Sequence, residues 1–120
     1  MKGLRARKKM LRSILAGDFE LWVPALWTYE MTNLLLSAHR RKRIANDAVF
    51  EALTLLSKVP IKHTDVPEPQ SQERTARFAL RFGLSAYDAA YLELSDRLQA
   101  SLHTSDSTLR KAAKTLGLTG

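Results

Sequence analysis

The spacing of apolar residues along the chain predicts a helix-rich protein with a few short strands. Apolar positions that recur about every 3.6 residues, bounded by capping residues, glycines and prolines, indicate the helices. The expected helices cover residues 3–16, 24–41, 45–58 and 72–82, a segment that begins at Ser85, and a last segment from Ser105 or Asp106 to Gly117. Short apolar runs between turn residues predict strands at 20–23, 60–64 and 101–105. Strands that alternate with helices indicate an α/β fold with a parallel sheet.

Length and composition bound the class of protein. A chain of 120 residues, 45% of them hydrophobic, is expected to form one globular domain over residues 1–120. No run of 18 apolar residues occurs, so we expect no membrane span and no membrane partner. The basic start is interrupted by Arg12 and lacks the apolar core of a secretion signal. Cysteine is absent, which excludes disulfides and thiolate metal sites and agrees with a cytoplasmic protein.

Charge is distributed unevenly along the chain. Residues 1–43 contain ten Lys and Arg against three acidic residues, whereas residues 44–120 contain nine of each. The excess lies in two runs, one within residues 2–12 and the other formed by Arg40, Arg41, Lys42 and Arg43. Such runs attract polyanions such as RNA or DNA, and they also occur as plain solvated surface.

One acidic residue lies inside an apolar helix. Glu30 belongs to the helix expected over residues 24–41, where it shares one side with Asn33, Ser37 and Arg40. This polar stripe is either the wet face of the helix or the lining of a cleft. A helix that is so apolar all round should be largely covered, which favours the cleft.

Asp88 and Asp106 have simple explanations as helix caps. Ser85 and Asp88 have the spacing of a variant capping box, and Asp106 suits an N-cap position. Both acids also adjoin predicted strand ends, where parallel α/β sheets bind ligands. Carboxylates that converge there repel one another, and Mg²⁺ or Mn²⁺ relieves the repulsion because these ions prefer carboxylate oxygens. The residues alone leave two alternatives, which are capping, or a metal site formed with Glu30.

Two segments resemble a known family. VPALWTYEMTNLLL (23–36) and LSAYDAAYLELSDRLQASLHTSDSTLRKAAKTLGL (84–118) resemble the PIN-domain ribonucleases, specifically the VapC-type toxins of bacterial toxin–antitoxin pairs. The resemblance covers about residues 11–118, and YDAAYLEL and TSD are its most specific parts. It implies a PIN-like three-layer α/β fold with a short central parallel sheet flanked by helices. It also implies Mg²⁺- or Mn²⁺-dependent hydrolysis of RNA phosphodiesters.

The resemblance also assigns roles to individual residues. Glu30, Asp88 and Asp106 match the family's catalytic, metal-binding acids, and Thr104 matches the hydroxyl residue that precedes the last of them. Asn33 is expected to support the same site. Arg40, Arg41, Lys42 and Arg43 are expected to bind nucleic acid. The implied partners are RNA, a cognate antitoxin that covers the acidic site, and a second copy of the chain.

The beginning of the chain departs from the family's pattern. Members begin with an apolar strand that carries the first acid, but residues 1–10 contain five Lys or Arg, which a buried strand would not tolerate. Asp18 does not replace this acid, because it lies in the turn before the strand at 20–23. We therefore expect a truncated PIN domain without its N-terminal strand, either because the natural start lies upstream or because the copy is repurposed. Such a chain should bind metal weakly and cleave RNA poorly.

Two other functions fit the same sequence. A non-catalytic module would bind nucleic acid through its basic runs, while the acids only cap helices. An interaction protein would expose Trp22, Trp27 or Tyr29 at an interface, although core packing is the commoner use of such residues. The three histidines, His39, His63 and His103, lack metal-ligand spacing and are expected to be plain side chains.

Overall fold

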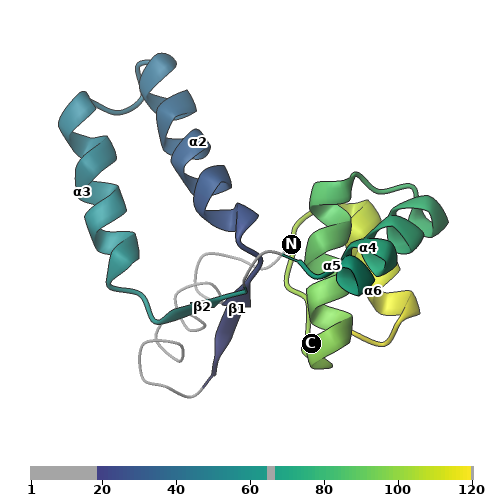
Figure 1. The fold of residues 1–120 in the computed structure, drawn as a ribbon. Coiled ribbons are helices and arrows are strands. Elements are labelled where there is room, and N and C mark those ends of the chain that lie inside the picture. Colours follow the sequence, from purple (N-terminus) through teal and green to yellow (C-terminus); the bar gives the residue numbers. More distant parts are fainter. Residues whose placement is uncertain (1–18, 65–66, 120) are drawn as a thin grey trace. The chain divides into compact units, whose positions relative to one another are not determined.

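The computed structural model describes residues 19–64 and 67–119, which belong to two compact units (Figure 1). The first unit ends at His63 and the second begins at Thr64. The elements in chain order are β1 (Leu21–Val23), α2 (Leu26–Arg40), α3 (Asn46–Ser57), β2 (Ile61–His63), α4 (Pro69–Phe82), α5 (Ala86–Leu98) and α6 (Ser107–Thr115). The helix expected over residues 3–16 lies outside the described residues. The helix-rich α/β class is confirmed.

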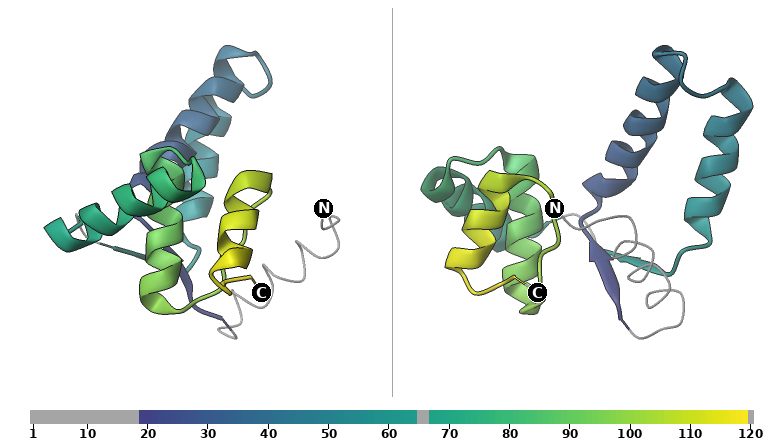
Figure 2. Two further views of the ribbon diagram at one scale, coloured as in Figure 1. Left: turned by 90° about the vertical axis from the view of Figure 1, so that its right-hand side faces the viewer. Right: turned by 180° about the vertical axis from the view of Figure 1, so that it is seen from behind.

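The first unit is a helical hairpin joined to a two-stranded parallel sheet. β1 pairs with β2 in parallel, with Leu21 opposite Ile61 and Val23 opposite His63. The connection between the strands contains α2 and α3, which lie side by side in each view (Figures 1 and 2). A parallel pair needs a long crossover of this kind, because no tight turn can join its strands. Both strands expected here, at 20–23 and 60–64, are confirmed.

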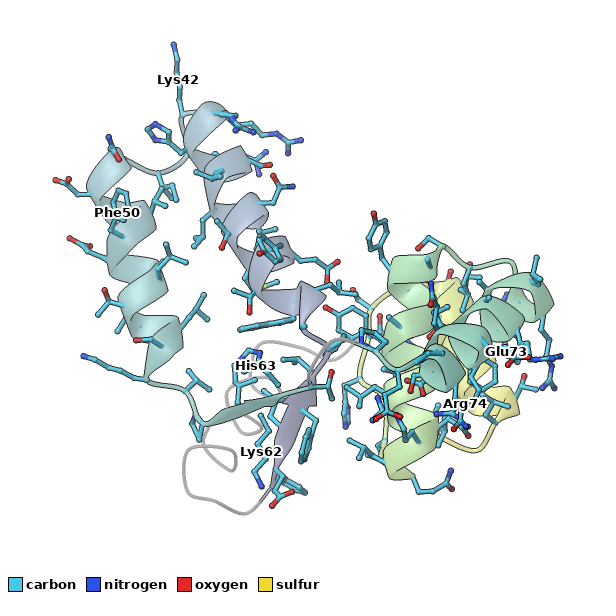
Figure 3. The ribbon with its side chains drawn as sticks, in the orientation of Figure 1. Lys42, Phe50, Lys62, His63, Glu73 and Arg74 are labelled. Atoms are coloured by element: carbon cyan, nitrogen blue, oxygen red, sulfur yellow. The ribbon has the colours of Figure 1, made fainter. Side chains whose placement is uncertain are left out.

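Side chains on one face of the sheet tie the two strands together. Lys62 Nζ donates to Glu20 Oε1 at 2.8 Å, and Trp22 Nε1 donates to Glu20 Oε2 at 3.2 Å. The same ammonium group lies 5.4 Å from the centre of a Trp22 ring. The hydrogen bond from Lys62, followed by the one from Trp22, lowers the pKa of Glu20 below its usual value. Figure 3 shows Lys62 and His63 on opposite sides of β2, as the alternation of a strand requires.

The helical hairpin exposes much of its apolar surface. Within the described part of the chain, α2 contains no buried residue and α3 buries only Val49. Tyr29 and Leu34 of α2 are 80% and 63% exposed, and Phe50 and Leu55 of α3 are similarly open. The expectation that α2 is largely covered is therefore wrong for the first unit taken by itself, and Tyr29 is no core residue.

The second unit consists of three helices, with α4 and α6 both packed against α5. Its core is one cluster of buried residues from α5, α6 and the segment after α6, namely Leu92, Leu109, Ala112, Ala113 and Leu118. Phe78 and Phe82 of α4 pack against this cluster from the side. α4 begins at Pro69, three residues earlier than expected, because proline suits the first helical turn. It ends at Gly83, whose φ of 66° is the left-handed conformation that terminates helices.

The strand expected at residues 101–105 is not present. The backbone N–H of Leu102 donates to the carbonyl of Leu118 at 2.7 Å, but no ladder of strand hydrogen bonds forms at residues 101–105. The prediction was wrong because a short apolar run is a strand only when a neighbouring strand pairs along its length. Here the neighbour is the irregular end of the chain after α6.

A buried carboxylate joins α4 to α5. Glu93 is 3% exposed, and it accepts hydrogen bonds from Arg74 Nη2 and Arg97 Nε, each at 3.0 Å. Arg74 of α4 (Figure 3) also donates to Ser71 at 3.3 Å. Because a buried charge is costly without such partners, this network explains how Glu93 is tolerated in the centre of the unit. The sequence analysis did not anticipate it.

Replacing Glu93 with glutamine should lower the free energy of unfolding by about 2 kcal/mol, because hydrogen bonds to a buried charge are lost while the shape is kept. Glu73→Gln is the matched control, since Glu73 pairs with Arg77 at 2.7 Å on the exposed surface of α4. That control should change stability by less than about 0.5 kcal/mol. Urea denaturation followed by circular dichroism measures both, and equal losses would contradict a special role for Glu93.

Replacing Lys62 with glutamine should raise the pKa of Glu20 toward its usual value of 4.5, because the largest cause of the lowering is removed. Because the pKa of Glu20 is lower in the folded than in the unfolded state, Glu20 stabilises the folded protein at pH values above its unfolded-state pKa. This contribution is lost as the pH falls through the folded-state pKa. An NMR titration of the Glu20 side chain measures the shift. Lys58→Gln, at the C-cap of α3, should leave the titration unchanged, because Lys58 is not among the causes of the lowered pKa.

Candidate functional site

Asp106 begins α6 and is held by its own turn. Its Oδ1 accepts a hydrogen bond from the backbone N–H of Leu109 at 2.8 Å, so the expected N-cap is confirmed. Its own backbone N–H donates to Thr104 Oγ1 at 3.1 Å, and Arg110 Nη2 donates to the Thr104 carbonyl at 3.0 Å. Thr104 therefore orients the turn that carries Asp106. The second carboxylate oxygen, Oδ2, accepts no hydrogen bond from the described residues.

Asp88 lies in the first turn of α5, and only half of a capping box forms around it. The backbone N–H of Asp88 donates to Ser85 Oγ at 3.1 Å, as expected for an N-cap serine. The half-buried carboxylate of Asp88 forms no hydrogen bond or ion pair within the described part of the chain. Capping therefore explains Ser85 but not the acidic side chain of Asp88. A negative charge is favoured here by the helix N-terminus and is available to a cation.

One buried cluster connects the two helix starts. Leu92 follows Asp88 by one helical turn, and Leu109 follows Asp106 by three residues, and both leucines belong to the core cluster of the second unit. Among the described residues, no group of three or more His, Asp and Glu side chains forms a cluster able to hold a metal ion. Two of the three predicted ligands, Asp88 and Asp106, lie in the second unit, and the third, Glu30, lies in the first.

Glu30 lies on α2, in the first unit. It is exposed, as are Asn33 one turn later and Arg40 at the end of the helix, whereas Ser37 is half-buried. The polar stripe expected along this helix is therefore present. The two units are described separately, so the meeting of Glu30 and Asn33 with Asp88 and Asp106 stays a prediction.

The four basic residues form the turn between α2 and α3. Three backbone hydrogen bonds of 2.9–3.0 Å close this turn, from Arg41 to Ser37, from Lys42 to His39 and from Arg43 to Ala38. Lys42 adopts a left-handed conformation with a φ of 59° and points away from the tip of the hairpin (Figure 3). Arg40, Arg41, Lys42 and Arg43 are all exposed, and none forms an ion pair with a described residue. We call this segment, Arg40–Arg43, the basic turn.

The first unit also contains a cavity of about 270 Å³ that the sequence analysis missed. Its walls come from α2, α3 and β2, where the rings of Trp27 and His63 lie 5.8 Å apart. The lining residues are Trp27, Thr28, Met31, Thr32, Leu53, Leu56, Ser57, Val59, Ile61 and His63. Since none of them is acidic, this cavity does not provide the ligands of the expected metal site.

A comparison with known protein families matches residues 4–115 to the PIN domain. The match covers most of the chain and extends over both units, so the chain belongs to the PIN-domain family. PIN domains are a family of nucleases that generally use divalent metal ions and act on nucleic acid. No individual curated protein matches the sequence. Among the described helices, none is long and apolar enough to cross a membrane.

The carboxylates of the second unit fit the metal ions that the family uses. Asp88 offers a half-buried carboxylate without a partner among the described residues, and Asp106 offers Oδ2 while Oδ1 caps α6. Mg²⁺ and Mn²⁺ prefer carboxylate oxygens and retain several water ligands, so two or three carboxylates suffice. The side chains of this chain therefore have the chemistry that such an ion requires.

Capping and metal binding by Asp106 can be separated by two substitutions. Asp106→Asn should keep the stability of the protein, because asparagine is as good an N-cap as aspartate, whereas Asp106→Ala should lose about 1 kcal/mol. Urea denaturation in EDTA measures both values without any contribution from a bound ion. A loss of stability in the asparagine variant equal to that in the alanine variant would contradict the capping role.

Proposed function

We propose that this protein is a metal-dependent endoribonuclease of the VapC type, which hydrolyses RNA phosphodiester bonds. One observation carries the proposal: in a PIN-family chain, the half-buried carboxylate of Asp88 has no partner among the described residues. The N-terminus of α5 favours a negative charge at this position, and a carboxylate without a partner among the described residues is available to a cation. The proposed ligands are Glu30, Asp88 and Asp106, with Thr104 and Asn33 in support.

Each of these residues has a distinct task in the proposed reaction. When bound, Mg²⁺ or Mn²⁺ supplies positive charge that stabilises the phosphoryl oxygens and the leaving group. Asp106 would present Oδ2 to the ion while its Oδ1 bond to Leu109 and the Thr104 turn hold it in one orientation. Asp88 would present its carboxylate from the first turn of α5. Glu30 would complete the site from α2, and Asn33, one turn away, would support it.

The basic turn and the exposed apolar residues of the hairpin support the proposed partners. Four exposed cations, none of them ion-paired with a described residue, suit the phosphate backbone of RNA, which they attract without reading its sequence. Tyr29, Leu34, Phe50 and Leu55 form apolar surface on α2 and α3 of the kind that protein partners cover. A cognate antitoxin, or a second copy of the chain, is the partner that VapC membership implies. A cytoplasmic location is part of the same proposal.

A second candidate function is non-catalytic binding of nucleic acid, and the basic turn is the observation that favours it. Such a module would need no metal, and its affinity would fall steeply with salt. EDTA separates the two functions, because it removes the activity of the proposed nuclease and leaves the binding of a pure binding module unchanged.

The proposed nuclease should cleave single-stranded RNA in Mg²⁺ or Mn²⁺ and stop in EDTA. Asp88→Asn should reduce the cleavage rate by at least about 100-fold, because it removes a proposed metal ligand. The loss of a residue that only hydrogen-bonds to a metal ligand has a smaller effect. Asp96→Asn is the control, since Asp96 lies at the other end of α5. Gel assays with a labelled RNA measure all three proteins.

Two outcomes of this assay contradict the proposal. One is cleavage that is equal in the wild type and Asp88→Asn, and the other is cleavage that persists in excess EDTA. The expectation that the chain cleaves RNA poorly stays a prediction, and rapid turnover by the unmodified protein would contradict it.

A further inference from the structure

The basic turn is a fixed feature and not a loose tail. Its backbone is closed onto α2 by the hydrogen bonds of Arg41, Lys42 and Arg43, and His39 Nδ1 lies 3.1 Å from the carbonyl oxygen of Ile44. The four cations stand at the end of the hairpin without acidic partners in the described part of the chain. The backbone that carries the four side chains is therefore already in place when an anion binds, so little backbone entropy is lost on binding.

α2 sets the distance between this turn and Glu30. Leu26–Arg40 is one continuous helix without an internal glycine or proline, so nothing in its sequence favours a kink. At 1.5 Å per residue, Arg41 lies about 16 Å along the helix axis from Glu30. Both residues belong to the first unit, so this separation does not depend on where the second unit lies.

We propose that α2 acts as a spacer that makes the protein select RNA chains over very short oligonucleotides. The inference rests on the proposed function, because it takes Glu30 as part of the cleavage site. Nucleotides that stay stacked advance about 3.4 Å each along a strand, so about five of them cover the distance from Glu30 to the basic turn, and an extended strand needs fewer. A substrate must reach that far on one side of the cleaved bond to gain the contacts of the turn. Mononucleotides and dinucleotides are too short.

The experiment trims the substrate one flank at a time. The main cleavage position is mapped in a long single-stranded RNA, and substrates with two to twelve nucleotides on either side are then compared. On one side, kcat/KM should fall by about 10-fold or more once the flank is shorter than about five nucleotides, because several phosphate contacts are lost together. On the other side the fall should be gradual or absent.

Two matched variants assign the effect to the basic turn. Arg41→Gln, Lys42→Asn and Arg43→Gln together remove three charges, and asparagine suits the left-handed backbone at position 42. Lys58→Gln, Lys111→Gln and Lys114→Gln together remove three charges from exposed positions on α3 and α6. The first variant should cleave long RNA only as well as the wild type cleaves trimmed RNA, with no further fall on trimming. The second variant should show the same fall in kcat/KM at short flanks as the wild type.

The results distinguish this inference from the proposed function. The spacer role of α2 is overturned if kcat/KM does not fall at a particular flank length, or if the same fall remains in the variant of the basic turn. Either result leaves the proposed nuclease activity intact. If no RNA is cleaved, the proposed function fails. The basic turn is then tested separately, by measuring how tightly the protein binds fluorescein-labelled RNA in EDTA. Affinity for a twelve-nucleotide RNA should then fall by about 10-fold or more in the variant of the turn and less in the control. Equal affinities overturn the inference.

Discussion

Capping at the starts of α5 and α6 organises the second unit and also presents its candidate ligands. Ser85 and Asp106 satisfy backbone N–H groups that would otherwise lack partners. The second turn of α5 and the first turn of α6 then bring Leu92 and Leu109 to the same core cluster. Without these caps the helices would fray at the ends where Asp88 and Asp106 stand. The same few hydrogen bonds therefore serve the fold and direct the carboxylates.

The acids of α5 show how burial and compensation separate structural from functional charges. Glu93 is almost completely buried, and two arginines and their hydrogen bonds compensate it. Asp88 is half-buried, five residues earlier on the same helix, and no described residue compensates it. Glu93 therefore has a structural role between α4 and α5, whereas the described contacts of Asp88 give its carboxylate no such role. This contrast supports a role for Asp88 outside the packing of the unit.

The first unit has a different balance of surface and core. Its helical hairpin leaves Tyr29, Leu34, Phe50 and Leu55 exposed, so the apolar character of α2 and α3 is not used up by contacts within the unit. The basic turn at the end of the hairpin is equally open. One short hairpin thus presents apolar surface of the kind that proteins cover and positive charge of the kind that attracts a polyanion.

Local signals in the sequence predicted most of the element boundaries. Gly83 ends α4, Ser85 and Asp106 begin α5 and α6, and the two short runs at 20–23 and 60–64 are strands. Each of these depends on a residue's own backbone preferences and on neighbours within one turn. The strand expected at 101–105 failed because pairing requires a distant partner, which a local pattern does not contain.

The candidate carboxylates and the basic turn could be identified from the sequence. An acid within an apolar helix and a run of four basic residues are local patterns, which can be recognised without knowledge of the fold. The Glu93 network was foreseeable only in part, through the spacing of Glu93 and Arg97, since Arg74 reaches it from another helix. The cavity between α2, α3 and β2 had no local signal at all.

The sequence by itself thus determined where the helices begin and end and which side chains carry charge. Only the tertiary structure decided which acids are compensated and which apolar residues are covered, because burial and pairing depend on segments that meet after the chain has folded.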